Sequence, residues 1–298
     1  MTPDASQAPP EPVERWMSPQ PVTVRPDDDL VHVLRLLERY PFRHLPVVDG
    51  NRLVGMLSDR DVCLAGGFAD ASGGGARALS ELAEIRVESI QSEAVETIGP
   101  DETVETAARR MLEKRIGALP VVDGGQCVGV ITTTDLMRRL RDCCQRTEAV
   151  DREHPPRVGE HVCRELVDCR PDQTMGEAVR LAYAQGVRHL PVRADGKLVG
   201  VLSDRDLRRA MAAEALAEAE AERDGKPAPA GRHVSDDMSR EVLTLAPDAT
   251  LSSAAHLLAE NRIGAIPIVE DDELVGIVTE ADLLSALLHV CDGRRGEG

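Results

Sequence analysis

The sequence predicts an α/β protein made of four copies of one β-α-β-β-α unit, paired two by two with pseudo-symmetry. Three observations carry this prediction. A Pro-Asp pair opens each of four similar stretches, other residues keep fixed distances from it, and two classes of copy alternate along the chain. One unit of roughly 50 to 60 residues has too little apolar surface to bury for stability alone. The copies are therefore expected to pair.

The repeat keeps strict register, which is the signature of an internal duplication. The Pro-Asp pairs begin at Pro26, Pro100, Pro171 and Pro247, and a second proline follows each at Pro46, Pro120, Pro191 and Pro267. A glycine comes next, at Gly55, Gly129, Gly200 and Gly276. The copy then closes on a hydroxyl residue (Ser58, Thr132, Ser203, Thr279) and an acid three positions later (Asp61, Asp135, Asp206, Asp282). No insertion or deletion interrupts any copy over this stretch.

Each copy predicts the same elements in the same order. A short extended segment, such as residues 22–24, leads into the Pro-Asp turn. The third residue after the proline is a good helix N-cap in every copy (Asp29, Thr103, Thr174, Thr250). Apolar residues at helical spacing follow. Two apolar strands joined by an Asp- and Gly-rich turn come next, and a final helix starts at the hydroxyl residue.

Shared local sequences show how the copies pair. Copies one and three share Arg-His-Leu-Pro-Val and Leu-Ser-Asp-Arg-Asp, whereas copies two and four share Arg-Ile-Gly-Ala. The predicted organisation is a disordered Pro-rich lead-in at 1–13, units at 14–66, 80–142, 158–211 and 232–290, and paired modules at 14–145 and 158–290. A Gly-rich linker is expected at 66–78, and an Ala- and Glu-rich helical extension is expected at 210–223.

Composition narrows the function classes. The net charge is -17 and aromatic residues make up 2%, which disfavours broad contact with nucleic acid or anionic membranes. There is no apolar run of membrane-spanning length and no export signal, so a cytoplasmic protein with reduced thiols is expected. His161, Cys163 and Cys169 raise the question of a metal, but small buried residues are the better interpretation of their spacing, and no metal site is predicted.

The unit resembles the CBS domain, named from cystathionine β-synthase, over about residues 14 to 290. The Gly-apolar-apolar-[Ser/Thr]-x-x-Asp segment, present four times, carries the resemblance. Two such domains in tandem form a Bateman module, and chains with four include the gamma subunit of AMP-activated protein kinase. The resemblance implies an adenine nucleotide (AMP, ADP or ATP) or another adenosyl compound as ligand, bound between paired domains, with no catalytic cofactor.

The [Ser/Thr]-x-x-Asp motif has two interpretations that the sequence leaves open. It is a helix capping box, which satisfies free backbone N–H groups. The same carboxylate can accept hydrogen bonds from the vicinal ribose hydroxyls, and a hydroxyl at a helix N-terminus can help to hold phosphate. The resemblance implies ribose contacts for Asp61, Asp135, Asp206 and Asp282, and ribose or phosphate contacts for Ser58, Thr132, Ser203 and Thr279.

Adenine is expected in an aliphatic pocket, because aromatic residues are scarce. The glycine after the first hairpin strand fits a close neighbour, which is either another chain segment or a purine. The expected pocket residues come from the first strand and the hairpin of each copy: Thr23, Val24, Val47, Gly55 and Met56; Thr97, Val121, Gly129 and Val130; Val192, Gly200 and Val201; Thr244, Ile268, Gly276 and Ile277. Asp168 replaces the first-strand threonine in copy three and puts that site in doubt.

Phosphate is expected to meet the basic residues of the odd copies. Arginine matches phosphate geometry, and the candidates are Arg43, His44, Arg60, Arg188, His189 and Arg205, with surface salt bridges as the alternative. The even copies carry Gly117-Ala118 and Gly264-Ala265 where the odd copies carry Arg-His. The small residues would leave room for phosphates held by the odd partner, so four copies predict fewer than four equal sites.

The sequence therefore predicts a non-catalytic nucleotide sensor that acts on an unknown effector protein. The alternatives are an assembly module with vestigial sites and a divalent-cation sensor. An enzyme is disfavoured, because no nucleophile–base pair or metal cluster is apparent. The sequence does not decide between a four-domain disc within one chain and a homodimer.

Overall fold

The computed structural model describes residues 11–40, 43–66, 79–150, 155–207, 209–210, 221, 226–227 and 231–292. Most of the predicted lead-in, the Gly-rich linker at 67–78 and nearly all of the helical extension predicted at 210–223 lie outside them. Residues 11–13 correct the lead-in prediction: Glu11 and Val13 are buried, Val13 completely. They belong to the fold because they pack on copy two.

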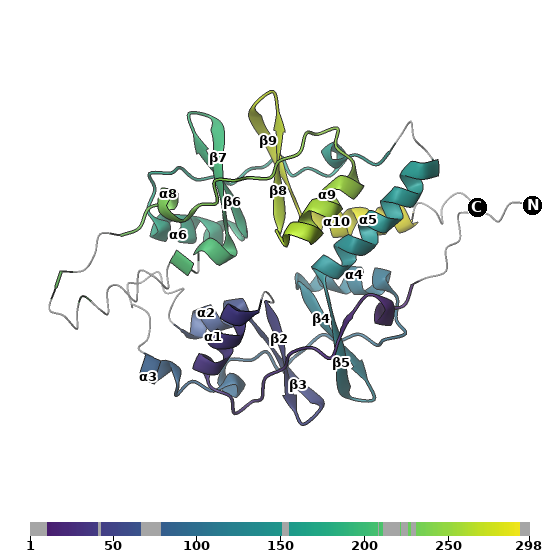
Figure 1. The fold of residues 1–298 in the computed structure, drawn as a ribbon, viewed down its shortest axis with the longest axis vertical. Helices are drawn as coiled ribbons and strands as arrows, with labels where there is room; N and C mark the ends of the chain where they lie inside the picture. Colours follow the sequence, from purple (N-terminus) through teal and green to yellow (C-terminus); the bar gives the residue numbers. More distant parts are fainter. Residues whose placement is uncertain are drawn as a thin grey trace, which may run out of the picture.

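Copies one and two, here named module one, form the lower half of the molecule in Figure 1, apart from their last helix, which extends into the upper half. The elements of module one are η1 (Val13–Arg15), β1 (Ser18–Pro19), α1 (Leu30–Arg39), β2 (His44–Asp49), β3 (Arg52–Ser58), α2 (Asp59–Ala65), α3 (Leu79–Leu82), η2 (Val87–Ser89), α4 (Val104–Lys114), β4 (Ala118–Asp123), β5 (Gln126–Thr132) and α5 (Thr133–Val150).

Copies three and four form the upper half, module two. Its elements are η3 (Val158–Glu160), α6 (Met175–Gln185), β6 (His189–Ala194), β7 (Lys197–Ser203), α8 (Val234–Asp237), α9 (Leu251–Asn261), β8 (Ala265–Glu270), β9 (Glu273–Thr279) and α10 (Glu280–Asp292). In copy three the second helix begins at Asp204.

The predicted β-α-β-β-α order is confirmed in all four copies. Each hairpin is antiparallel and carries a bulge at the same place, for example between Val47 and Val48. The first strand is reduced to one parallel bridge, such as Val24 with Val47. The four predicted N-caps accept the expected backbone hydrogen bonds, as Asp29 does from the N–H of His32 at 2.8 Å.

Each copy sends its leading segment onto its partner. A short helical turn before each copy, at η1, η2, η3 and α8, buries one valine in the core of the other copy of the module; these valines are Val13, Val87, Val158 and Val234. The chain then bridges the partner's second hairpin strand before it returns to its own copy, as Ser18 does with Val130. This exchange is why single copies do not stand alone and why neighbours along the chain pair.

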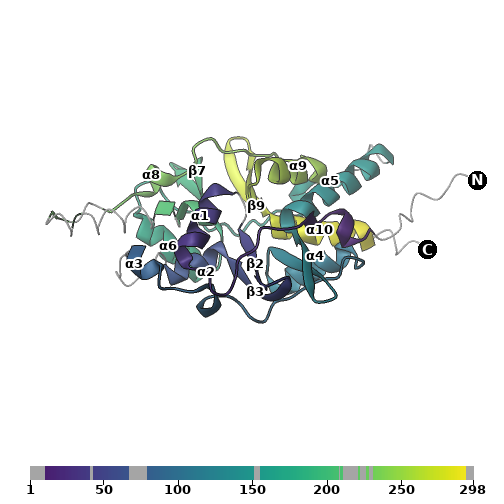
Figure 2. The same cartoon turned by 60° about the horizontal axis from the view of Figure 1, so that its bottom comes forward.

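The two modules pack on each other within the chain, chiefly through their even copies. Helices α5 and α9 lie side by side, and α10 packs against α4 and α5 (Figures 1 and 2). One apolar core runs through copies two and four, with Leu136 and Leu258 among its members, whereas copies one and three have separate cores. The structure therefore is a four-copy disc, held most firmly along its even side.

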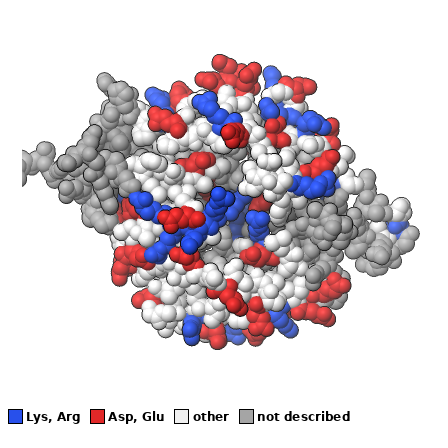
Figure 3. Space-filling model, turned by 180° about the vertical axis from the view of Figure 1, so that it is seen from behind, with Lys and Arg blue, Asp and Glu red and all other residues white. Residues whose placement is uncertain are grey.

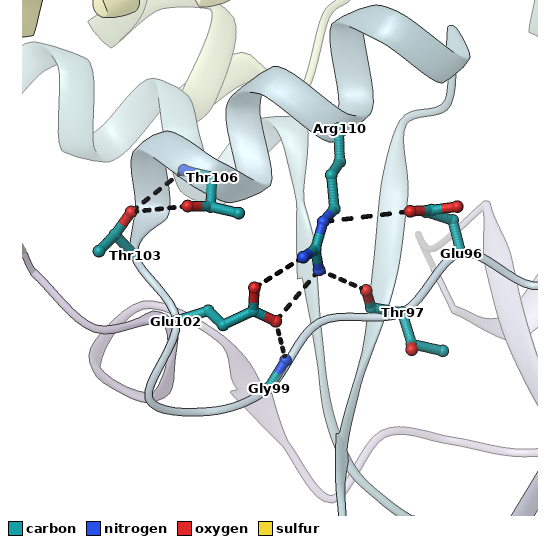
Figure 4. Close-up of polar contacts among 7 residues, drawn as sticks. All are labelled: Glu96, Thr97, Gly99, Glu102, Thr103, Thr106 and Arg110. Atoms are coloured by element: carbon teal, nitrogen blue, oxygen red, sulfur yellow. Dashed lines mark hydrogen bonds and ion pairs between the residues drawn. The ribbon is translucent and has the colours of Figure 1, made fainter.

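One polar network is particular to copy two and braces its first strand (Figure 4). Arg110 on α4 donates to the Thr97 carbonyl at 2.7 Å and to both carboxylate oxygens of Glu102, at 2.7 and 3.1 Å. Glu102 also accepts from the Gly99 N–H at 2.8 Å, and these contacts lower its pKa. The other three copies carry leucine at the position of Arg110, so this arginine has a structural explanation.

Within the described ranges, no helix combines the length and the apolar character that crossing a bilayer would require.

Candidate functional site

In every copy the aspartate of the [Ser/Thr]-x-x-Asp motif caps its own Ser or Thr, and in copies one, three and four the hydroxyl also accepts from the aspartate N–H at 3.3 to 3.4 Å. In copy two, Oδ2 of Asp135 accepts from the Thr132 backbone N–H at 2.9 Å and from its hydroxyl at 2.6 Å. The equivalent pairs in the other copies lie at 2.8 Å for the N–H and at 2.6 to 2.7 Å for the hydroxyl. The capping interpretation is therefore confirmed, and it uses one oxygen of each carboxylate.

The second oxygen of Asp135 is held differently. Its Oδ1 accepts from a guanidinium nitrogen of Arg138, one turn along α5, at 3.0 Å. Asp135 is buried, and the loss of hydration raises its pKa although Thr132 and Arg138 act in the opposite direction. A ligand that used this carboxylate through Oδ1 would have to displace or share Arg138.

The hairpin glycines face the partner's leading segment. A Cβ on Gly129 would lie 2.4 Å from the sulfur of Met17, and a Cβ on Gly200 would lie 2.7 Å from the sulfur of Met238. Gly55 and Gly276 face Gln91 and Val162 in the same way. The close neighbour expected at these glycines is thus a crossing chain segment. No ligand base is needed to explain them.

The residues expected around adenine fall into two sets. Val24, Val47, Val121, Val192 and Ile268 are buried in the cores of their own copies. Met56, Val130, Val201 and Ile277 instead pair with the crossing segments, at Ser92, Ser18, Ser239 and Cys163 respectively. Thr244 is exposed, and Thr23 and Thr97 are half-buried. The second set borders the clefts between copies, so a base bound there would meet the crossing segment first.

Asp168, which departs from the threonine of the other copies, has a partner on the adjacent strand. Its carboxylate receives two hydrogen bonds from Arg193, at 2.8 and 3.0 Å. Arg193 stands where the other copies carry Val48, Val122 and Val269, so both residues of the pair differ together. The ion pair explains why copy three tolerates an acid in this strand.

A pocket of about 370 Å³ lies where all four copies meet. Copy one contributes Arg43 and His44, copy two contributes Gly117, Thr132 to Asp135 and Arg138, copy three contributes Arg188 and Arg205, and copy four contributes Arg262 and Glu280; the crossing segment from Ser18 to Val22 completes the wall. On the face seen in Figure 3, basic side chains gather around a hollow where the modules meet. A chain of net charge -17 thus concentrates five arginines at one pocket.

His44 and His189 occupy the space that the even copies leave open. A Cβ on Gly117 would lie 3.3 Å from Cε1 of His44, and a Cβ on Gly264 would lie 2.6 Å from Cε1 of His189. This corrects the expectation that these glycines make room for phosphate, because the room is taken by imidazoles. Both histidines are half-buried, and the loss of hydration, with nearby Arg43 and Arg188, lowers each histidine pKa to about 4.

The four arginines predicted to bind phosphate lie in two places. Arg43, Arg188 and Arg205 line the central pocket, and Arg188 also donates to the Arg115 carbonyl of module one at 3.4 Å. Arg60 lies elsewhere, with its guanidinium 5.2 Å from the ring centre of Tyr183 on α6. That contact joins copies one and three, so Arg60 has an interface role in this structure.

Sequence reasoning missed three charged residues of the pocket: Arg138, Arg262 and Glu280. Arg262 belongs to the Arg-Ile-Gly-Ala segment shared by the even copies, and it is the left-handed C-cap of α9 (φ 52°) at the pocket wall. Glu280 follows the motif threonine directly, a position that is acidic in three copies and Thr133 in copy two. That single difference was the available signal, and it marks the position that faces the other module.

Of the three residues considered as metal ligands, Cys163 and Cys169 lie in different environments. Cys169 is buried in the core of copy three, and burial raises its thiol pKa to about 12, whereas Cys163 is exposed on the segment that crosses to β9. Within the part of the chain that the structure describes, no group of three or more His, Cys, Asp or Glu side chains could hold a metal ion.

Comparison with known proteins identifies the repeat. The family model of the CBS domain matches residues 13–66, 87–142, 158–213 and 234–289. Protein MJ1225 of Methanocaldococcus jannaschii is 27% identical over 277 residues, covering 88% of this chain and 94% of that protein. A 33.4 kDa protein encoded in a ribosomal RNA operon of Thermofilum pendens is 26% identical over 285 residues, covering 91% and 89%.

The fold agrees with the sequence match. The crystal structure of MJ1225, described as a candidate archaeal homologue of g-AMPK, superposes with a TM-score of 0.76 at 23% identity, covering 93% of this chain and 99% of that one. At this identity the likeness shows a shared arrangement of four units. The chain therefore belongs to the CBS-domain family and consists largely of four CBS domains.

Proposed function

We propose that this protein is a non-catalytic regulatory sensor that binds an adenine nucleotide, or another adenosyl ligand, between its paired copies. The observation that carries the proposal is the central pocket, which joins the Thr132–Asp135 motif to arginines from all four copies. Its volume of about 370 Å³ lies within the usual range for small-molecule sites. A carboxylate near several arginines suits a ligand that has both hydroxyl groups and phosphate.

In the proposed complex the ribose hydroxyls donate to Asp135, whose Oδ2 is already fixed by the cap. Arg138 then turns from Asp135 towards the ligand, because guanidinium prefers a phosphate dianion to a shared carboxylate. The base lies against the apolar side chains of Val22 and Val130, of which Val22 is 40% exposed. Arg43 and Arg188 are placed to bind phosphate from opposite modules.

Ligand binding would change the relative position of the two modules. The pocket is lined by both, and a ligand that contacts both stabilises one relative position over others. The even side shares a core, whereas copies one and three have separate cores, so the odd side is where the modules can shift. An effector protein that contacts the odd side would sense the ligand.

Isothermal titration calorimetry with AMP, ADP, ATP, S-adenosylmethionine and cyclic di-AMP tests the proposal. Titrations with Mg²⁺ alone and with Ca²⁺ alone test the alternative that the protein senses a divalent cation. The matched variants are Asp135→Asn and Asp282→Asn, since both carboxylates make the same cap but only Asp135 lines the central pocket. We expect D135N to abolish binding in the pocket, while both variants lose similar stability.

If D135N binds every nucleotide as the wild type does and only its melting temperature falls, the motif is a cap alone. The protein would then be an assembly module with vestigial sites. If no nucleotide binds the wild type at all, the proposed function is refuted.

A further inference from the structure

Glu280 is a half-buried acid that lines a basic pocket. It is the first residue of α10, its backbone N–H donates to the Gly264 carbonyl at 3.1 Å, and its side chain lines the pocket. The side chain of Thr133, the residue at the equivalent position of copy two, lines the same pocket and lies close enough to favour the ionised carboxylate. The acid of one module therefore lies beside the hydroxyl residue of the other, at the pocket where the modules meet.

The charges around Glu280 come from several elements. Arg43, before β2, and Arg188, before β6, both lie close enough to favour its ionised form, while burial acts against that form and raises its pKa. The same two arginines lower the pKa values of the adjacent His44 and His189. The arginines expected to bind phosphate are thus the ones that Glu280 partly neutralises.

Glu280 lowers the net positive charge of the pocket. The described lining includes five arginines and two carboxylates, Asp135 and Glu280, which leaves three positive charges when both acids are ionised. A nucleoside monophosphate brings about two negative charges and a triphosphate about four near neutral pH. The monophosphate is accommodated by this balance, whereas the triphosphate exceeds it beside a fixed acid.

We propose that Glu280 sets the charge selectivity of the pocket, so that ligands with one phosphate are preferred over ligands with three. This rests on the proposed function, because it concerns the same pocket and its phosphate end. Thr133, Arg43 and Arg188 line the same pocket as the carboxylate and come from three other copies. Removing the charge of Glu280 while keeping its shape should relax the selectivity.

The test compares wild type, Glu280→Gln and the matched control Glu273→Gln by isothermal titration with adenosine, AMP and ATP. Glutamine keeps the shape and removes the charge. Glu273 is exposed at the start of β9, so E273Q changes the net charge equally but far from the pocket. Thermal unfolding of all three proteins checks that each is folded.

We expect E280Q to bind AMP about tenfold more tightly and ATP about a hundredfold more tightly, since a charge a few ångströms away acts in proportion to ligand charge. Adenosine affinity should change by less than about twofold, because adenosine carries no charge. E273Q should match the wild type with all three ligands. A merely structural role for Glu280 would change the three affinities together.

Three other outcomes are decisive. If the wild type binds nucleotides and E280Q gives the same AMP-to-ATP ratio, the selectivity role is refuted and the proposed function stands. If only E280Q binds, the acid excludes anions as proposed, but the nucleotide function of the native chain is refuted. If neither protein binds any of the three ligands, both proposals are refuted.

Discussion

Acidification should destabilise this fold through two histidines. His44 and His189 are half-buried, each opposite a glycine of the even copy, with Arg43 and Arg188 nearby. Burial and these arginines lower both histidine pKa values from 6.5 to about 4. The folded protein therefore keeps both imidazoles neutral at a pH where the unfolded chain protonates them.

The sign and size follow from proton linkage. Between pH 6.5 and 4 the unfolded state binds more protons than the folded state, so the free energy of unfolding falls as the pH falls through this window. A tenfold difference in proton affinity corresponds to about 1.4 kcal/mol. At pH 5 each histidine then costs about 2 kcal/mol, and the pair costs about 4 kcal/mol relative to neutral pH.

Urea unfolding at pH 7.5, 6.5, 5.5 and 5.0 measures this loss in the ligand-free protein. The comparison is between wild type and the double variant His44→Gln/His189→Gln, with the exposed His256→Gln as control. The carboxylates, including Asp135 and Glu280 with their raised pKa values, titrate in all these proteins and largely cancel in the difference. The double variant should lose about 4 kcal/mol less than wild type on going to pH 5. Equal losses would refute the assignment of neutral imidazoles.

Three further predictions concern packing and polar contacts. Gly264→Ala should lower the free energy of unfolding by about 1–3 kcal/mol, because the added Cβ would lie 2.6 Å from the imidazole of His189. Gly117→Ala should be nearly neutral, since its Cβ would lie 3.3 Å from His44. Equal melting temperatures of the two variants would contradict this prediction. Arg110→Leu should cost about 1 kcal/mol in urea unfolding by removing the brace on copy two, and no loss relative to the exposed Arg109→Leu would refute the brace. Leu258→Ala should cost about 2–5 kcal/mol and lower a single melting transition shared by both modules; two separate transitions would show that the even-side core does not couple them.

Register alone predicted most of the fold. The hairpins, the four N-caps and the pairing of neighbours all follow from residues at fixed distances from Pro26, Pro100, Pro171 and Pro247. The exchanged leading segments were missed because each lies before the recognisable repeat and resembles a linker. A signal was present, since Val13, Val87, Val158 and Val234 all stand at one fixed distance before those prolines. Buried valines in a repeated register indicate structure even where glycine and proline surround them.

The candidate site was harder to predict, because it is formed between modules. The sequence named Arg43, His44, Arg188 and Arg205, which the structure brings to one pocket. It could not show that Glu280 and Thr133 meet there, since their contact depends on how α5 and α10 pack. The spacing of the repeat predicts positions within one copy. Contacts between modules depend on how the folded modules pack, which the repeat does not show.

The two classes of copy have a physical reason that does not depend on any ligand. Where an odd copy places His189, the even partner has Gly264, and an added Cβ there would already lie 2.6 Å from the ring. An Arg-His pair in every copy would demand two imidazoles in a volume that holds one. Packing therefore requires each module to combine one Arg-His copy with one Gly-Ala copy. Since the arginine adjacent to each histidine reaches the centre, as Arg43 and Arg188 do, the same constraint concentrates positive charge in one shared pocket. Unequal sites are thus a consequence of how the module packs, before any nucleotide is considered.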